Sequence, residues 1–192
     1  MRLWPKLKIN RVLGIDPGLD RTGWAVIENG PAGILLTAAG LIHTDKNLSF
    51  PERLKQTYEN IQEVINKFQP TVAALEVMFF LKRAMTMSHT IQTRGVIVLA
   101  LAQNNLEIYE YPAKRVKLTI SGNGAADKKQ MQRMVQLTLK LKEILKPDDV
   151  ADAAAIALCH LKSAPLANQI KLKQNFLARL EMEKQKQIKK NR

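Results

Sequence analysis

Four acidic side chains stand where the predicted elements begin or end. Asp16 ends the short apolar run RVLGID, and Glu76 ends a second such run, TVAALE. Asp149 and Asp152 fall in KPDDVADAAAIALCH, three residues apart, so they share one face of a predicted helix. A carboxylate at the end of a buried run is costly unless a nearby group favours negative charge. The pattern therefore predicts a positively charged partner.

Each of these acids, taken alone, also has a purely structural explanation. Asp148, directly after a proline, is most simply a helix N-cap, and Asp149 would suit the first helical turn because of the helix dipole. Asp16 alone would serve as a turn residue, and Glu76 alone as an edge residue. Capping explains Asp152 less well, since it points among the alanines that follow it. The doublet leaves open whether Asp148 or Asp149 is the functional acid.

As a group, the acids indicate a metal site. Two unit charges about 4 Å apart repel by ~1 kcal/mol in water and ~4 kcal/mol near a protein surface, so three or four carboxylates at one spot require a cation. Carboxylate oxygen is a ligand of Mg²⁺ and Mn²⁺, and no cluster of His or Cys points to zinc. One such ion, or two at ~3.5–4 Å, can hydrolyse a phosphodiester by in-line attack of water. Together with the basic composition described below, the acids therefore predict a nuclease site.

The elements that would position these acids alternate between strands and helices. Three strands joined by short turns favour an antiparallel meander, because parallel neighbours need a longer crossover. The strand 71–76 follows a helix and should lie parallel to the first strand, so Asp16 and Glu76 should sit side by side at the carboxyl ends, where ligands gather. The fold class is therefore α/β, a five-stranded mixed sheet of three meander strands plus two parallel strands, flanked by helices. The short, mixed stretch 114–120 is given no element. The expected strands are 11–17, 22–29, 33–44, 71–76 and 107–112, and the expected helices are 50–70, 84–104, 128–142 and 148–161.

The amino-acid composition limits the kinds of partner that the chain is expected to bind. The 192 residues include 30 Lys plus Arg and 17 Asp plus Glu, a net charge of +13. This excess favours a polyanion, either nucleic acid or an anionic membrane surface. The longest apolar run, Val96–Ala102, is far shorter than the ~18 residues that span a bilayer, and no signal peptide is evident, so we expect a cytoplasmic protein without membrane contact. The single cysteine, Cys159, lies in an apolar run and should be a small buried side chain.

The chain length suits one buried core. We expect an N-terminal extension over 1–10, one domain over 11–162 and a basic C-terminal tail over 163–192. The tail ends in KQKQIKKNR, which cannot build a core, and is expected to be a frayed helix or a disordered arm.

An ordered set of motifs resembles a known family. LGIDPG with TGWAVIE, ALE followed by a loop containing FF, QTRGV, the block YPAKRVKLTISGNGAADKKQMQRMV, and DDVADAAAIALCH resemble the RuvC family of Holliday-junction resolvases over 11 to about 162. The resemblance implies an RNase H-like fold, a homodimer, and Mg²⁺-dependent symmetrical nicking of four-way DNA junctions in recombination and repair. It implies Mg²⁺, or Mn²⁺ in its place, with two ions per active site, and a branch-migration motor as a partner complex. It places the catalytic, metal-binding acids on Asp16, Glu76, Asp149 and Asp152.

Six further side chains are expected to contact DNA. The resemblance places a DNA-inserting aromatic at Phe79, where it would stack on or wedge between unpaired bases, although a strand-end aromatic is more often core. Lys117 and Lys128 flank the Gly-rich loop SGNGAAD, whose backbone N–H groups can approach a phosphate. One of these lysines would also stabilise transition-state charge. The remaining candidates for phosphate contact, each of which would otherwise simply be solvated, are Lys82, Arg83 and Arg94.

Two other classes of protein compete with a nuclease. LGIDPG also begins sugar kinases and actin-like ATPases, but those folds need two phosphate motifs in duplicated domains, for which this chain is too short. A non-catalytic DNA-binding module would explain the charge and leave the converging acids unexplained. The helix 84–104 carries GVIVLALA, which is too apolar to face water on every side, and part of it is the expected dimer surface.

Overall fold

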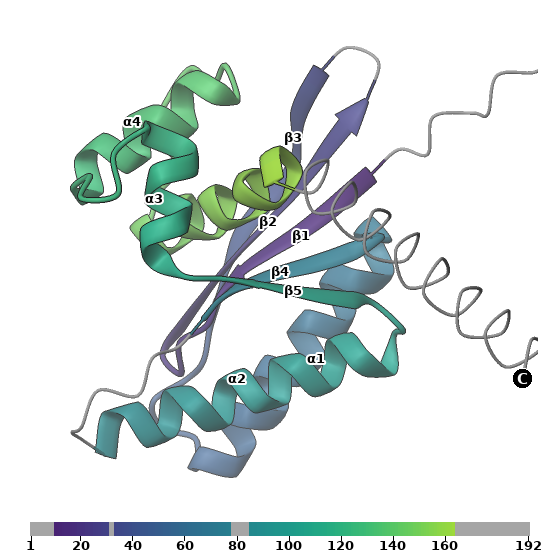
Figure 1. Ribbon diagram of the computed structural model, residues 1–192. Coiled ribbons are helices and arrows are strands. Elements are labelled where there is room, and N and C mark those ends of the chain that lie inside the picture. Colours follow the sequence, from purple (N-terminus) through teal and green to yellow (C-terminus); the bar gives the residue numbers. More distant parts are fainter. Residues whose placement is uncertain (1–9, 31–32, 78–84, 164–192) are drawn as a thin grey trace, which may run out of the picture. The chain divides into compact units, whose positions relative to one another are not determined.

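The computed structural model describes residues 10–30, 33–77 and 85–163. Its strands are β1 (Asn10–Asp16), β2 (Arg21–Gly30), β3 (Gly33–His43), β4 (Val72–Glu76) and β5 (Glu107–Tyr111). They form one five-stranded sheet in the order β3-β2-β1-β4-β5 (Figure 1). β1, β2 and β3 pair antiparallel, whereas β4 is parallel to both β1 and β5. The predicted mixed sheet of three meander strands and two parallel strands is therefore confirmed.

Helices cover both faces of this sheet in the described part of the chain (Figure 1). They are α1 (Phe50–Phe68), α2 (Met85–Gln103), α3 (Ala113–Ser121), α4 (Lys128–Thr138) and a last helix that runs over 148–163. α1 and α2 lie on one face, and the last helix crosses the other (Figure 1). The chain divides into two units, Met1–His160 and Leu161–Arg192, and the sheet belongs to the first.

The parallel pairing of β1 and β4 sets the position of the two strand-end acids. The two strands run in register, with Ile15 opposite Leu75. The residues that follow this pair are Asp16 and Glu76, so both acids lie at the carboxyl ends of neighbouring strands. On its other side, Asp16 is paired with Gly23 of β2.

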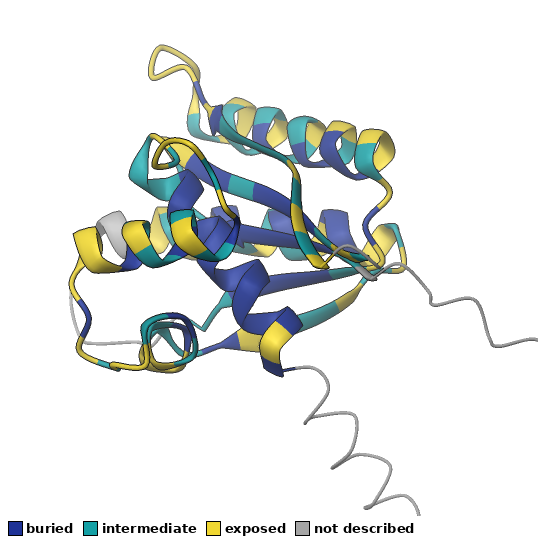
Figure 2. Cartoon of the chain, turned by 90° about the horizontal axis from the view of Figure 1, so that it is seen from above, coloured by how far each residue is buried: buried dark blue, intermediate teal, exposed yellow. Residues whose placement is uncertain are grey.

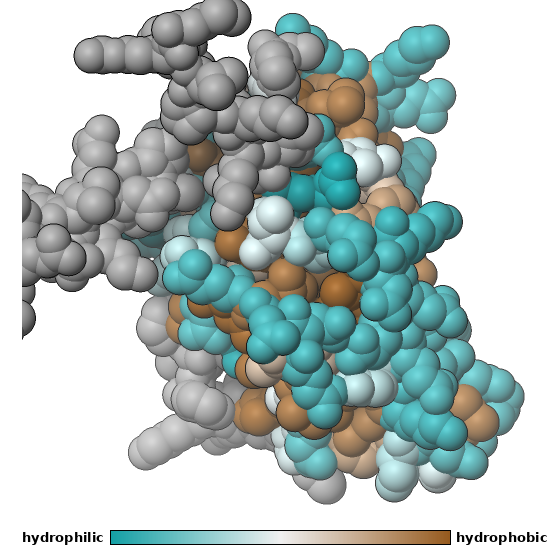
Figure 3. All heavy atoms as spheres, turned by 90° about the vertical axis from the view of Figure 1, so that its right-hand side faces the viewer, coloured by the Kyte–Doolittle hydropathy of each residue, from teal (hydrophilic) through white to brown (hydrophobic). Residues whose placement is uncertain are grey.

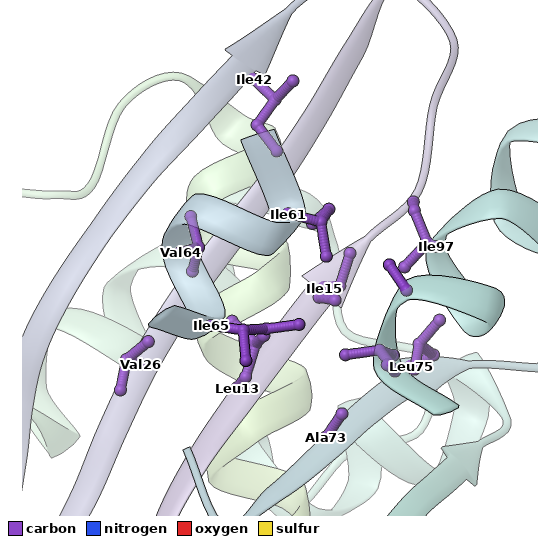
Figure 4. Close-up of a cluster of buried hydrophobic side chains, with 12 residues drawn as sticks. Leu13, Ile15, Val26, Ile42, Ile61, Val64, Ile65, Ala73, Leu75 and Ile97 are labelled. Carbon is purple, nitrogen blue, oxygen red and sulfur yellow. The ribbon is translucent and has the colours of Figure 1, made fainter. Parts of the chain in front are cut away.

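The core between the sheet and the α1–α2 layer follows the two-residue period of the strands. Leu13 and Ile15 of β1 are fully buried, and they pack in one cluster with Ile61 of α1 and Ile97 of α2 (Figure 4). Most of the buried strand residues belong to β1, β2 and β4, whereas the edge strands β3 and β5 and the outer faces of the helices are more exposed (Figure 2). α1 begins directly after Ser49, whose backbone N–H donates a hydrogen bond to the carboxylate of Glu52 at 2.8 Å.

The last helix approaches the opposite face of the sheet very closely. A Cβ atom on Gly14 would lie 2.2 Å from the carbonyl oxygen of Ala153, and one on Gly23 would lie 2.0 Å from that of Asp149. Both glycines therefore make room for the helix backbone itself. The alanines 153–155 are buried, as is Cys159, which agrees with its predicted structural role.

Two elements differ from the prediction. The structure has α3 where the sequence pattern predicts no element, with only Val116 and Ile120 buried on it. In the sequence, the apolar residues of this segment are Val116, Leu118 and Ile120, which alternate with polar ones and so give no helical period to be recognised. α4 ends at Thr138 rather than at residue 142, because the chain turns away at Lys140, whose φ of 52° is left-handed.

Hydrophilic side chains cover much of the face shown in Figure 3, with hydrophobic ones between them. Among the described residues, no helix is long and apolar enough to cross a membrane. α2 nevertheless exposes large apolar side chains: Leu99 is 52% exposed and Ile91 is 36% exposed.

Candidate active site

A cavity of about 320 Å³ opens beyond the carboxyl ends of β1 and β4. Three acids line it, Asp16, Glu76 and Asp152, together with the basic side chains Lys117 and Lys128. An apolar wall around charged groups lowers the local dielectric and strengthens the interactions between them. That wall consists of Ala113, Val116, Met131, Ala155 and Ile156.

Separate stretches of the chain deliver these charged side chains. Asp16 and Glu76 end neighbouring parallel strands, and Asp152 comes from the first turns of the last helix. Lys117 projects from α3, and Lys128 is the first residue of α4. α4 begins at a fixed point because Asp127 caps it, accepting a hydrogen bond from the backbone N–H of Gln130 at 2.8 Å.

Burial and mutual repulsion raise the pKa of the acids in the cavity. The pKa of Asp16 rises to about 7, mainly because the carboxyl group is buried. Burial is also the main cause of the raised pKa of Glu76 and of Asp152. Lys117 opposes the shift at Glu76, and Lys128 opposes those at Asp16 and Asp152. The carboxylates that raise the pKa of Asp16 further are those of Asp152, Glu76 and Asp149.

Ion pairs surround the start of the last helix. Lys128 pairs with Asp148, which is the first residue of the helix rather than its N-cap, and its Nζ lies 3.6 Å from Oδ2 of Asp152. Arg21, the first residue of β2, places Nη2 3.2 Å from Oδ2 of Asp149 and 3.8 Å from Oδ1 of Asp148. The hydrogen bond with Lys128 lowers the pKa of Asp148 and raises the pKa of the lysine.

The acids fit a hard divalent cation in kind and in charge. Carboxylate oxygen is the ligand that Mg²⁺ and Mn²⁺ prefer, and burial, with the neighbouring carboxylates, raises the pKa of Asp16 despite the charge of Lys128. A further cation would stabilise its charged form. Within the described ranges, no three His, Cys, Asp or Glu side chains are arranged so that they could hold a metal ion as they stand. Coordination would therefore require these side chains to turn toward the ion.

Comparison with known proteins shows the family. The family model for crossover junction endodeoxyribonuclease RuvC matches residues 12–160. The chain belongs to the RuvC family. It is 44% identical over 160 residues to RuvC of Roseiflexus sp., covering 83% of this chain and 95% of that protein. It is 47% identical over 156 residues to RuvC of Caldicellulosiruptor saccharolyticus, covering 80% and 93%.

A solved structure of the same family supports the assignment. RuvC of T. thermophilus in complex with a Holliday junction substrate is 30% identical to this chain, with a TM-score of 0.77. The match covers 82% of this chain and 96% of that one. The RuvC neighbours and the five-stranded mixed sheet together establish the RNase H-like fold that the motifs imply.

The residues predicted from the RuvC-like motifs fall into three groups. Lys117 and Lys128 line the cavity beside three of the four predicted acids. Asp149 lies just outside it, and Arg94 forms an ion pair with Glu110 and does not line the cavity. The remaining predicted DNA contacts lie outside the described residues, and they are Phe79, Lys82 and Arg83.

The sequence pattern did not point to Arg21, although it pairs with two of the clustered acids. The only local signal is that Arg21 lies two residues before Gly23. Residues two apart in a strand share one face, so Arg21 lies on the same face of β2 as Gly23. Gly23 in turn is paired with Asp16 and touches the backbone of Asp149. Recognising Arg21 therefore required the contact between β2 and the last helix, which has no mark in the sequence.

Proposed function

We propose that this chain is a structure-selective endonuclease that resolves Holliday junctions by symmetrical, metal-dependent phosphodiester hydrolysis during DNA recombination and repair. The observation that carries the proposal is the convergence of Asp16, Glu76 and Asp152 on one cavity that also holds Lys117 and Lys128. Membership of the RuvC family supports the same activity, as does the likeness to a RuvC structure that contains a Holliday junction.

In this proposal the acids hold Mg²⁺, or Mn²⁺ in its place, as two ions in one site. The four acids are Asp16, Glu76, Asp149 and Asp152, each of which either lines the cavity or raises the pKa of Asp16. When bound, the ions would supply an activated water for in-line attack and stabilise the leaving 3′ oxygen.

The basic side chains have a separate part in the reaction. Lys117 and Lys128 reach the cavity from α3 and α4, so their ammonium groups would draw the scissile phosphate toward the acids. Lys128 stays charged, because its hydrogen bond to Asp148 raises its pKa. Such fixed positive charge also stabilises the additional negative charge of the transition state.

The DNA contacts beyond the cavity remain predictions. Phe79 would insert between bases at the junction centre, and Lys82 and Arg83 would contact phosphates beside it. Arg94 could join them only by leaving Glu110, with which it pairs. We therefore expect Lys117 and Lys128 to contribute more to phosphate binding than Arg94.

The partners follow from the same proposal. The chain would act as a homodimer, with part of α2 as the shared surface, and together with a branch-migration motor complex in the cytoplasm. Residues 11–162 would form the nuclease domain. The flanking segments 1–10 and 163–192 carry an excess of Lys and Arg over acids and would add to the attraction for DNA.

The decisive experiment is a cleavage assay on a synthetic four-way junction and on plain duplex, with Mg²⁺ and then with EDTA. We expect symmetrical nicks in the junction alone, and only with Mg²⁺. Asp16→Asn should lower the nicking rate at least about 1,000-fold, because the site loses a charged ligand. It should bind the junction in EDTA at least as tightly as the wild type, because one negative charge is removed.

The control for this assay is Asp45→Asn, which removes an acid that is exposed and hydrogen-bonded within its own turn. It should nick at the wild-type rate. Junction binding without any nicking in Mg²⁺ would instead support a non-catalytic DNA-binding module. Normal nicking by Asp16→Asn would remove Asp16 from the active site.

A further inference from the structure

Asp149 is turned away from the cavity that the other acids share. It does not line that cavity, but it lines a neighbouring groove of about 490 Å³ beside Arg21. Its charge nevertheless raises the pKa of Asp16, so the carboxylate lies within electrostatic range of the cavity. Asp149 therefore lies between the cavity and the groove, and its side chain lines the groove.

The contact that holds Asp149 in the groove is ionic. Nη2 of Arg21 lies 3.2 Å from Oδ2 of Asp149, and the same guanidinium reaches Asp148 at 3.8 Å. Oδ2 of Asp149 is shielded from solvent and has no hydrogen bond. A buried carboxylate oxygen that is held by charge alone is open to replacement by a stronger cation.

The strand beneath fixes the backbone of this acid. Arg21 and Gly23 share one face of β2, and a Cβ on Gly23 would lie 2.0 Å from the carbonyl oxygen of Asp149. The main chain of Asp149 is therefore seated directly on the sheet. Only its side chain can turn, and in the structure that side chain is paired with Arg21.

We propose that Arg21 is a positioning residue that holds the Asp149 carboxylate outside the cavity while no divalent ion is bound, as an internal counter-ion that the ion must displace. The inference rests on the proposed function, because it takes Asp149 as one of the acids that turn toward the ion. Arg21 thus acts on the site through Asp149 and touches no reacting atom.

The proposal predicts tighter ion binding when Arg21 is neutralised. In Arg21→Gln the carboxylate of Asp149 is free to turn, and one positive charge near the site is gone. Both effects favour a divalent cation, and together they should lower its dissociation constant about three- to tenfold. Arg21→Lys keeps the charge and should bind the ion as the wild type does.

The experiment titrates Mn²⁺ into the DNA-free protein and counts unbound ion by electron paramagnetic resonance. Arg21→Leu accompanies Arg21→Gln, because leucine keeps the apolar stem if glutamine disturbs folding, and thermal unfolding in EDTA verifies each variant. The matched control is Lys46→Gln, since Lys46 lies on a nearby turn, is 70% exposed and pairs with Asp20 rather than with the site acids. It should leave Mn²⁺ binding unchanged.

The outcomes separate this inference from the function on which it rests. Unchanged or weaker Mn²⁺ binding in both neutral variants would overturn the role of Arg21, and so would an equal gain in Lys46→Gln, which would reveal an effect of net charge alone. In either case, loss of Mn²⁺ binding and of nicking in Asp16→Asn would leave the proposed function standing. If Asp16→Asn bound Mn²⁺ and nicked junctions as the wild type does, the proposed metal site itself would be contradicted.

Discussion

Aspartates that lie a short distance apart in this fold have different pKa values, because their surroundings differ. Asp148 is paired with Lys128, and this partner lowers its pKa. Asp16 is buried among other carboxylates, which raises its pKa to about 7. Chemical type alone therefore does not identify the working acid. An acid whose charge the fold leaves uncompensated is the one that a cation can stabilise most.

The raised pKa of Asp16 predicts how stability depends on pH without a metal ion. The folded pKa lies above the unfolded value of 3.8, so the folded state binds more protons between about pH 4 and pH 7. Wild-type stability should therefore fall across this window and stay reduced above it. Asp16→Asn removes the effect and should be more stable than the wild type at pH 8 in EDTA, by on the order of 2–4 kcal/mol, and by no more than about 1 kcal/mol at pH 4.5.

Urea unfolding of both proteins at the two pH values measures this difference. Comparing variant with wild type at each pH cancels the titrating groups that do not interact with Asp16, such as the buried His160, whose pKa is lowered by burial. Asp45→Asn should show no such dependence. A stabilisation of Asp16→Asn that is equal at both pH values would contradict the raised pKa.

At the level of elements, the last helix brings its acids to the cavity because glycines let it touch the sheet. Gly23→Ala would place a Cβ 2.0 Å from the carbonyl oxygen of Asp149, which is backbone and cannot swing aside. The start of the helix would have to move. We expect a loss of about 1–3 kcal/mol in the free energy of unfolding, with nicking reduced more strongly than junction binding.

The matched control for this change is Gly30→Ala, at the other end of the same strand. A Cβ there would meet nothing closer than a side-chain oxygen of Glu28 at 3.8 Å. Its stability should stay within about 0.5 kcal/mol of the wild type. If Gly23→Ala nicked junctions normally, the contact between Gly23 of β2 and the backbone of the last helix would not be what positions the acids.

The fold was largely predictable, because its strands end where turn residues and acids follow apolar runs. The run TVAALE predicts a strand over 71–76, and the structure has β4 over Val72–Glu76. α3 was missed because Val116 and Ile120 are its only buried residues and give little periodic signal. Local pattern thus predicted elements where burial is continuous and failed where it is sparse.

The site was predictable only in part, for a different physical reason. Acids at strand ends can be recognised in the sequence, because a charge directly after an apolar run is unusual. Asp16 and Glu76 could therefore be chosen from the sequence. Which way Asp149 turns depends on Arg21, which lies well over a hundred residues away in the chain. A pairing of this kind is a tertiary contact and leaves no local pattern.

At the level of the whole molecule, one stripe of α2 has no cover within the described chain. Ile91, Gly95, Leu99 and Ala102 are all exposed and recur three or four residues apart, so they share one helical face without a charge. An apolar stripe of this kind is typical of an interface, and it is the surface that the proposed homodimer would share. A substrate with two equivalent strands suits two active sites related by two-fold symmetry, as a homodimer would provide.

Leu99→Asp tests this surface, because it places a charge in the middle of the stripe on a side chain that is 52% exposed. Self-association measured by analytical ultracentrifugation should weaken about 30-fold or more. Paired nicking of the two opposed strands should be lost at concentrations where the variant is monomeric. Leu137→Asp is the control, since Leu137 is 59% exposed but lies on α4, and it should leave both properties intact. A Leu99→Asp protein that still dimerised and still nicked in pairs would place the interface on another face.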